Sequence, residues 1–195
     1  RRYIVVQLPE PLAPRNEGQS AAVEFCDHLG KSRTLAEVTK ERLRRAAQDV
    51  TKGHPLFRGA LGFRAFKLDS SNIRAWDATG GDLAKTLLES VEHLDKDRTE
   101  QDIFYELLLK LGLDLCVPIE TRKIAGKDVY STGGGVLMAC LAERIASDEL
   151  EALTQGILHW HKLMAPTGAT TCVFRDSAFV DDVTKTNVAA ILNQH

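Results

Sequence analysis

Residues 3–8, with the sequence YIVVQL, decide the predicted fold. The run is continuous and rich in β-branched and aromatic residues, whereas a strand with one face in water alternates apolar and polar residues. A continuous run is typical of a strand that is covered on both faces, as in a parallel sheet. Pro9 ends the run, and a polar, proline-rich loop continues to residue 20. The alternative is a short edge strand at a true N-terminus.

The segments that follow supply helices and a second strand for this sheet. Helices are predicted over 20–29 and 35–50, the second with Thr34 as N-cap and Glu37 three residues later. Residues 62–68 alternate in polarity and are predicted as a strand. Strand, helix and strand in this order indicate a βαβ unit. Because such a sheet needs further strands, we expect the preceding part of this domain to lie outside the chain.

The rest of the chain is predicted as a smaller α/β unit. Its expected elements are helices over 82–94, 99–111, 148–163 (with Ser147 as cap) and 180–193, and strands over 115–120, 127–131, 136–141 and 171–174. Glycine-containing turns join the first three strands, which favours a short antiparallel meander. We place the boundary between the two domains after residue 78.

Composition excludes several classes of protein. The chain has 195 residues, of which 44% are hydrophobic and 27% charged, and its formal net charge is −2. These values are typical of a soluble globular protein and not of a disordered or collagen-like chain. The longest apolar runs are far shorter than the roughly 20 residues of a membrane helix, so no membrane contact is expected. Four cysteines without a CxxC pair favour a reducing compartment, and we expect the protein in the cytoplasm.

Motifs that resemble reactive sites each have a simpler structural interpretation. Residues 133–135, a glycine triplet, precede a predicted strand and not the helix of a phosphate loop, so they are interpreted as a hairpin turn. His159 and His161 are two residues apart on a predicted helix and point in different directions, so they cannot chelate one ion. Aspartates at 176–182 are interpreted as capping and solvated charge, with a cation site as the alternative. We predict no catalytic and no metal-binding residues.

Two predicted helices carry features of an interaction surface. The helix over 35–50 has a basic face, and residues 31–45 hold six basic and two acidic residues. This face is interpreted as solvated, with contact to DNA phosphates as the alternative. The helix over 99–111 is apolar around most of its circumference, so it must be covered on more than one side. It is either a core helix or, through Phe104 and Leu108, a dimer contact.

Seven segments, taken in order, resemble a known family. They are RRYIVVQLPEPL, TKERLRRAA, GFRAFKLDSSNIRAWD, ESVEH, DIFYELLLKLGLDLCVPIE, VYSTGGGVLMACL and CVFRDSAFVDDVTKTNVAAIL. Together they are similar to the C-terminal part of the modification subunits of type III restriction–modification systems. These subunits are DNA adenine methyltransferases that use S-adenosylmethionine. The resemblance covers essentially the whole chain.

The resemblance implies a fold and a function. Residues 1–78 would be the C-terminal remnant of a Rossmann-like methyltransferase sheet, and residues 79–195 a C-terminal interaction domain. The family's Asp-Pro-Pro-Tyr-type catalytic motif and its glycine-rich cofactor motif are both missing from the sequence. The implied activity of the intact parent is transfer of a methyl group to adenine N6. We expect the fragment alone to be inactive and to supply scaffold and subunit contacts.

The resemblance also implies a cofactor and partners. In related methyltransferases an acidic residue at the end of the second strand accepts hydrogen bonds from the cofactor ribose, and Gln7, with Glu10 close by, stands near that position. The neutral amide of Gln7 departs from this pattern. S-adenosylmethionine is expected in the intact parent and not on the fragment alone. Expected partners are DNA through the parent, a second modification subunit in a homodimer, and a restriction subunit where the system has one. The alternative function is a stand-alone dimerisation or docking module for a restriction subunit.

Overall fold

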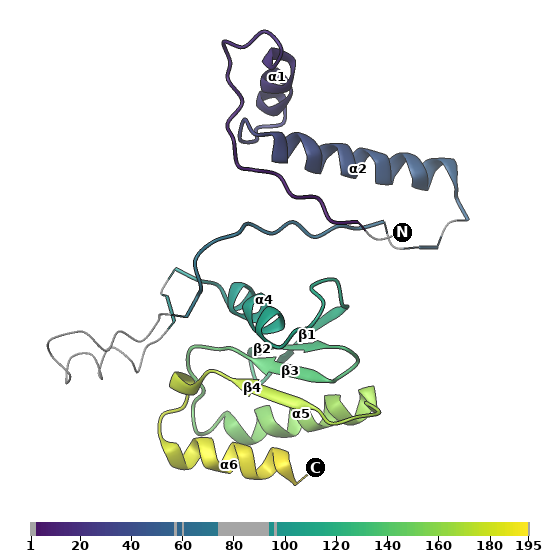
Figure 1. Ribbon diagram of the computed structural model, residues 1–195. Coiled ribbons are helices and arrows are strands. Elements are labelled where there is room, and N and C mark those ends of the chain that lie inside the picture. The colour runs from purple at the N-terminus through teal and green to yellow at the C-terminus, as the bar shows by residue number, and fades with distance from the viewer. Residues whose placement is uncertain (1–2, 57, 60, 74–93, 96, 195) are drawn as a thin grey trace, which may run out of the picture. The chain divides into compact units, whose positions relative to one another are not determined.

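The computed structural model describes residues 3–56, 58–59, 61–73, 94–95 and 97–194 (Figure 1). The chain divides into two compact units, Arg1–Leu68 and Asp69–His195. The boundary predicted after residue 78 and most of the helix predicted over 82–94 lie outside the described residues.

The first unit contains the two helices predicted from its sequence. Helix α1 spans Ser20–His28 and helix α2 spans Leu35–Gly53. The side chain of Thr34 caps α2 by accepting a hydrogen bond from the backbone N–H of Glu37, as predicted. A small core of Leu12, Val23 and Cys26 holds α1 against the start of α2.

The two strands predicted in the first unit are not formed in the structure. Residues 3–8 and 62–68 run as extended backbone outside any sheet. The described residues therefore do not confirm the partial Rossmann-like sheet. A strand is defined by pairing with a neighbour, and neither run belongs to the four-stranded sheet of the second unit.

The second unit is built on an open, mixed sheet of four strands. These are β1 (Ile119–Ile124), β2 (Lys127–Thr132), β3 (Leu137–Cys140) and β4 (Thr171–Phe174), in the spatial order β1-β2-β3-β4. Antiparallel pairing joins β1 to β2 and β2 to β3, which forms the predicted meander. Strand β4 lies parallel to β3 and is reached through helix α5 (Leu150–Met164). The mixed α/β class is thus confirmed for this unit.

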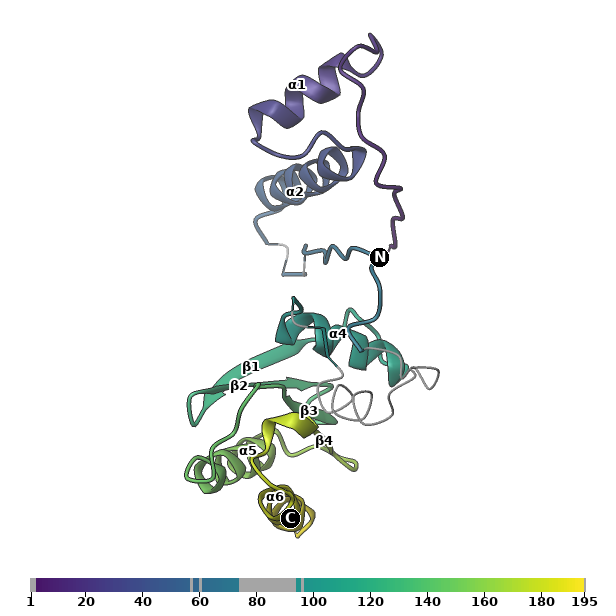
Figure 2. The same ribbon diagram turned by 90° about the vertical axis from the view of Figure 1, so that its left-hand side faces the viewer.

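Helices cover both faces of this sheet (Figures 1 and 2). On one face, Phe104 and Leu108 of helix α4 (Glu100–Lys110) pack on side chains of β2 and β3 such as Tyr130 and Leu137. On the other, α5 packs on the alternate residues of the same strands: Val129, Met138 and Cys140 meet Leu153, Ile157 and Trp160. Helix α6 (Asp182–Asn193) packs against α5 on the side away from the sheet. The unit is a three-layer arrangement with a further outer helix.

The ends of the helices and strands show which caps and boundaries were predicted correctly from the local sequence. Thr99 and Asp102 form the predicted reciprocal capping box of α4. The predicted cap Ser147 is wrong: Glu149 occupies the N-cap position of α5 and makes no side-chain cap, and its carboxylate accepts instead from the N–H of Ala146. Strand β1 begins four residues later than predicted because a turn at 114–117 precedes it. Among the described helices, none combines the length and the hydropathy needed to cross a bilayer.

The close approach of α5 to β1 generates a first prediction. A Cβ built on Gly156 would overlap Cγ2 of Ile124, a branched side chain with little freedom to move away. We expect Gly156→Ala to lower the free energy of unfolding by about 1–2 kcal/mol, because overpacking outweighs the helix propensity gained. Urea unfolding followed by circular dichroism measures this change.

Two further variants isolate the steric cause. Gly168→Ala is the matched control, since a Cβ there meets nothing within 4 Å. In an Ile124→Ala background the clash is removed, so Gly156→Ala should become neutral or stabilising. A loss of stability of equal size in both backgrounds would disprove the packing explanation.

Candidate functional site

The two residues expected near a cofactor lie on the surface of the first unit. Gln7 and Glu10 are both exposed and belong to the extended N-terminal segment. The side-chain amide of Gln7 donates only to the neighbouring carbonyl oxygen of Leu8, at 3.3 Å. Neither residue lines the groove described below. The expected role of Gln7 and Glu10 in cofactor binding therefore stays a prediction.

The apolar side chains around Gln7 are also exposed. Ile4 and Val6 are 92% and 86% exposed, and Leu8 is 64% exposed. In the second extended segment, Leu68 is 98% exposed. A contiguous set of large apolar side chains in water is unfavourable, because each buried side chain of this size gains about 1.5–3 kcal/mol. This surface is consequently a candidate for contact with another protein segment.

A groove of about 330 Å³ runs between α1 and α2 in the first unit. Its lining combines apolar groups of Phe25, Val38 and Ala46 with the charged groups of Arg42, Arg45 and Asp49. The guanidinium of Arg45 lies over the Phe25 ring, 4.9 Å from its centroid, and also pairs with Glu41 at 2.9 Å. The groove therefore places two guanidinium groups beside apolar side chains.

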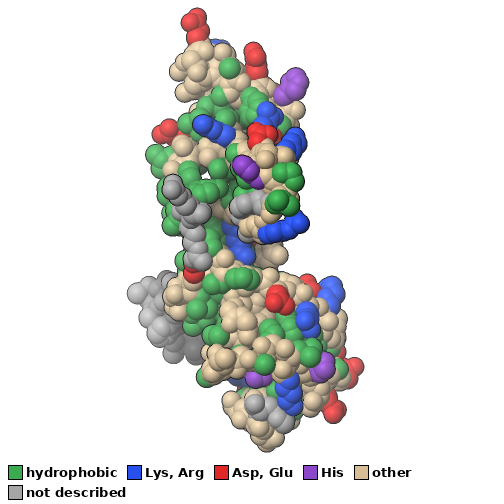
Figure 3. Space-filling model, turned by 90° about the vertical axis from the view of Figure 1, so that its right-hand side faces the viewer, with side chains coloured by type: hydrophobic (Ala, Val, Ile, Leu, Met, Phe, Trp, Pro, Cys, Tyr) green, Lys and Arg blue, Asp and Glu red, His purple; other side chains and the backbone are tan. Residues whose placement is uncertain are grey.

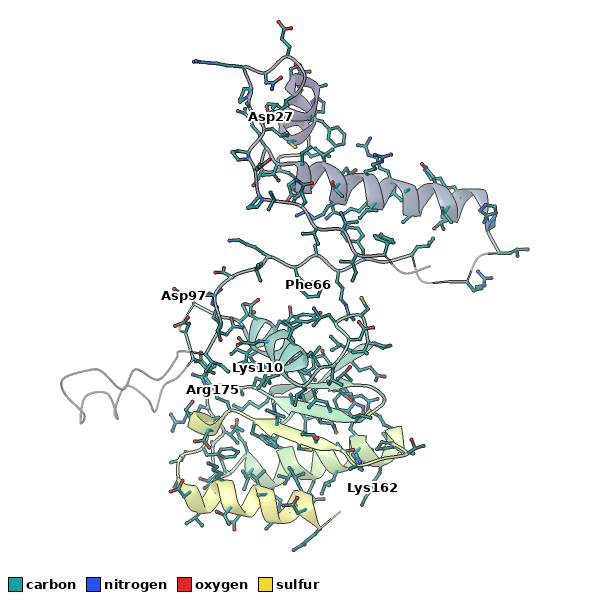
Figure 4. The ribbon with its side chains drawn as sticks, in the orientation of Figure 1. Asp27, Phe66, Asp97, Lys110, Lys162 and Arg175 are labelled. Carbon is teal, nitrogen blue, oxygen red and sulfur yellow. The ribbon has the colours of Figure 1, made fainter. Side chains whose placement is uncertain are left out.

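Basic groups elsewhere in this unit are arranged along α2. Arg44 lies 5.9 Å from the centroid of Phe63 and 3.5 Å from Glu41. Lys40 pairs with Glu37. At the end of α1, Asp27 accepts from Arg33, whose hydrogen bond lowers the pKa of Asp27 (Figure 4). Arg42 makes no ion pair with any residue that the structure describes.

In the second unit, the carboxylate of Glu106 fixes residues 71–72 to α4. It accepts hydrogen bonds from Ser71 Oγ at 2.5 Å, from the backbone N–H of Asn72 at 2.7 Å and from Asn72 Nδ2 at 2.6 Å. Lys110, one turn on, lies 3.0 Å away (Figure 4). Burial by itself raises the pKa of Glu106, but these donors outweigh it and lower the pKa to about 2. The group is a structural anchor that remains ionised.

Tyr130, Cys140 and Cys172 of the sheet are poorly suited to acid–base or nucleophilic catalysis. Tyr130 stacks on Phe104, and its hydroxyl donates to Glu100 at 3.4 Å. Burial raises the pKa of Tyr130 to about 12, so it stays neutral at pH 7. Burial also raises the pKa of the Cys140 and Cys172 thiols, which keeps them in the unreactive protonated form.

The glycine triplet is a hairpin turn, as predicted. All three glycines have positive φ, which is why this sequence can join β2 to β3. Thr170 Oγ1 donates to the Gly135 carbonyl at 2.8 Å and lies 2.9 Å from His161 Nε2. His161 therefore ties the end of α5 to this turn, while His159 is exposed.

The aspartates at 176–182 have structural partners. Asp181 caps α6 by accepting from the N–H of Thr184 at 2.6 Å, which lowers the pKa of Asp181. Asp176 pairs with Lys185. Within the described ranges, no group of three or more His, Cys, Asp or Glu side chains is placed to hold a metal ion.

The apolar helix α4 is covered on one face within the chain. Phe104 and Leu108, the residues expected in a dimer contact, are only 1% and 0% exposed because the sheet already buries them. Leu109 and Leu111 are 61% and 50% exposed, but they are two residues apart and point in different directions. Phe104 and Leu108 are therefore core residues in this structure.

Sequence reasoning missed the contacts that join distant segments. Glu106 meets Asn72 across 34 residues, and Arg122 of β1 lies 4.7 Å from the centroid of the buried Trp160 ring of α5. No periodicity or motif marks such pairs. Comparisons with family models, with curated proteins and with solved structures found no match to the chain.

The hydrogen bonds to Glu106 generate a second prediction. Because its pKa in the folded protein lies below the ordinary value of 4.5, its contribution is present above pH 4.5 and is lost as pH falls towards 2. We expect Glu106→Gln to lower the free energy of unfolding at pH 7 by about 2 kcal/mol. The difference from the parent should shrink at pH 3, as measured by urea titration at both pH values.

A matched variant separates this effect from a general change of charge. Glu120→Gln removes an exposed carboxylate from β1 of the same unit and should change stability by less than about 0.5 kcal/mol. Equal effects of the two variants at pH 7 would contradict the anchoring role of Glu106.

Proposed function

We propose that the chain is the C-terminal part of a modification subunit of a type III restriction–modification system. The intact parent would be an S-adenosylmethionine-dependent methyltransferase acting on adenine N6 of DNA in the cytoplasm. Within it, this part supplies scaffold and subunit contacts. The order of the seven sequence segments supports the family assignment, and the reaction and cofactor follow from that assignment.

The exposed apolar run at residues 3–8 is the observation that carries the proposal. Val6 is 86% exposed in a segment whose composition suits an interior strand. The same unit contains a second extended segment and two helices in the order of a βαβ unit. A parallel sheet in the parent would bury these side chains, which gains hydrophobic free energy.

The residues of this chain do not by themselves fit S-adenosylmethionine. Gln7 and Glu10 are exposed, and neither of them lines the groove between α1 and α2. In the parent, Gln7 would stand at the end of the completed strand, where its amide oxygen can accept from a ribose hydroxyl.

The second unit supports a role in assembly. Its described side chains form two cores, and the carboxylate of Glu106 anchors residues 71–72 to α4. The exposed Leu109 and Leu111 at the end of α4 favour a second candidate, in which the unit is a dimerisation or docking module for a restriction subunit. Light scattering on Leu109→Asp tests that candidate, because a lost dimer with an intact fold supports it and an unchanged dimer excludes this surface.

The proposal predicts that the protein encoded by the complete reading frame methylates DNA. It also predicts that the methylation rate depends on Val6. With labelled S-adenosylmethionine and duplex DNA, we expect the label in N6-methyladenine. Val6→Asp should reduce the rate at least 100-fold, because a carboxylate inside a sheet disrupts the cofactor-binding domain. Nucleoside analysis of the digested DNA measures both results.

Leu56→Asp provides the matched control. Leu56 is 87% exposed, close to the value for Val6, but it lies in a turn outside the proposed sheet. Its replacement should leave the rate within about twofold. Absence of N6-methyladenine from the parent reaction, or equal losses in the two variants, would overturn the proposal.

A further inference from the structure

The charges of the chain are segregated between its two units. Residues 1–68 contain 13 Lys and Arg against 7 Asp and Glu, a net charge of +6. Residues 69–195 contain 12 Lys and Arg against 20 Asp and Glu, a net charge of −8. The near-neutral net charge of the chain is therefore the sum of a strongly basic unit and a strongly acidic one. The positive potential over the basic unit attracts polyanions.

Helix α2 is the most accessible element of the basic unit. None of its 19 residues is buried, and at 1.5 Å per residue it is about 28 Å long. Its positive charge is denser than that of its surroundings, since Lys40, Arg42, Arg44 and Arg45 fall within six residues. Figure 3 shows basic side chains on one face of this unit, with acidic ones between them.

The arginines of α2 are held in place and only partly neutralised. The rings of Phe25 and Phe63 position Arg45 and Arg44, and the single carboxylate of Glu41 serves both guanidinium groups. Arg42 has no ion pair among the described residues. Ordered guanidinium groups lose little entropy on binding and match phosphate oxygens with two donors each.

We propose that α2 docks on the sugar–phosphate backbone of duplex DNA without reading its sequence, through Arg42, Arg44 and Arg45. The choice of DNA over other polyanions rests on the function proposed above. The arginines replace counterions on the duplex, and Glu41 is displaced from one of its two partners. The surface orients the basic unit on DNA and adds affinity without sequence specificity.

The experiment uses the full 195-residue chain and a fluorescein-labelled 25-base-pair duplex of arbitrary sequence. Anisotropy titrations run at several salt concentrations from 50 to 200 mM. We expect binding with a Kd of about 10⁻⁶–10⁻⁴ M, weakening steeply with salt. The triple variant Arg42→Gln, Arg44→Gln, Arg45→Gln should bind at least tenfold more weakly at 50 mM. Its slope of log K against log salt should be smaller in magnitude by about 2–3, near 0.9 for each lost phosphate contact.

The control triple variant removes the same charge from exposed positions of the second unit. Lys123→Gln, Arg144→Gln and Lys162→Gln should change affinity by less than threefold and leave the salt slope unaltered. Circular dichroism shows whether each variant keeps its helices, and glutamine favours that outcome as a good helix former.

Several outcomes would overturn the docking surface. They are equal weakening by the two triple variants, no binding of the parent chain at 50 mM salt, or a preference for one duplex sequence. Low-salt self-association that is lost in the α2 variant, without DNA binding, would assign the surface to an acidic protein instead. The two proposals can fail separately. DNA binding through α2 can persist when the protein from the complete reading frame forms no N6-methyladenine. Conversely, methylation can persist when the α2 variants bind duplex DNA as tightly as the parent chain.

Discussion

The burial of β3 on both faces is the constraint on which the second unit depends. Its four residues are all buried, with Leu137 and Ala139 facing α4 and Met138 and Cys140 facing α5. Neither helix can be removed without exposing half of the strand. The two cores therefore form together, and α4, α5 and the sheet must assemble as one structure.

The same constraint explains the difference between the two units. Residues 3–8 have the composition of a strand with two covered faces, yet in this chain Ile4 and Val6 lie in water. The core of the first unit is limited to Leu12, Val23, Cys26 and their neighbours. The first unit therefore exposes apolar side chains that its own small core does not cover, and these side chains are available for contact with another segment.

Two surfaces of the first unit carry the two proposals. The apolar side chains of the extended segments suit burial in a larger sheet, which is a matter of hydrophobic area. The arginines of α2 suit phosphate, which is a matter of charge and donor geometry. The second unit is acidic, and the carboxylates of Glu106, Asp181 and Asp102 accept hydrogen bonds within it.

The sequence by itself determined the features that depend on neighbouring residues. The caps at Thr34 and at Thr99 with Asp102, the glycine turn at 133–135 and the helices they delimit were predictable, because capping and turn geometry involve residues at most four apart. Only the tertiary structure decided whether residues 3–8 pair, that Phe104 and Leu108 are core, and that Glu106 holds Asn72. Pairing and packing join segments that are tens of residues apart. A strand-like pattern therefore shows that a segment favours a sheet, but not whether a neighbouring strand is present to pair with it.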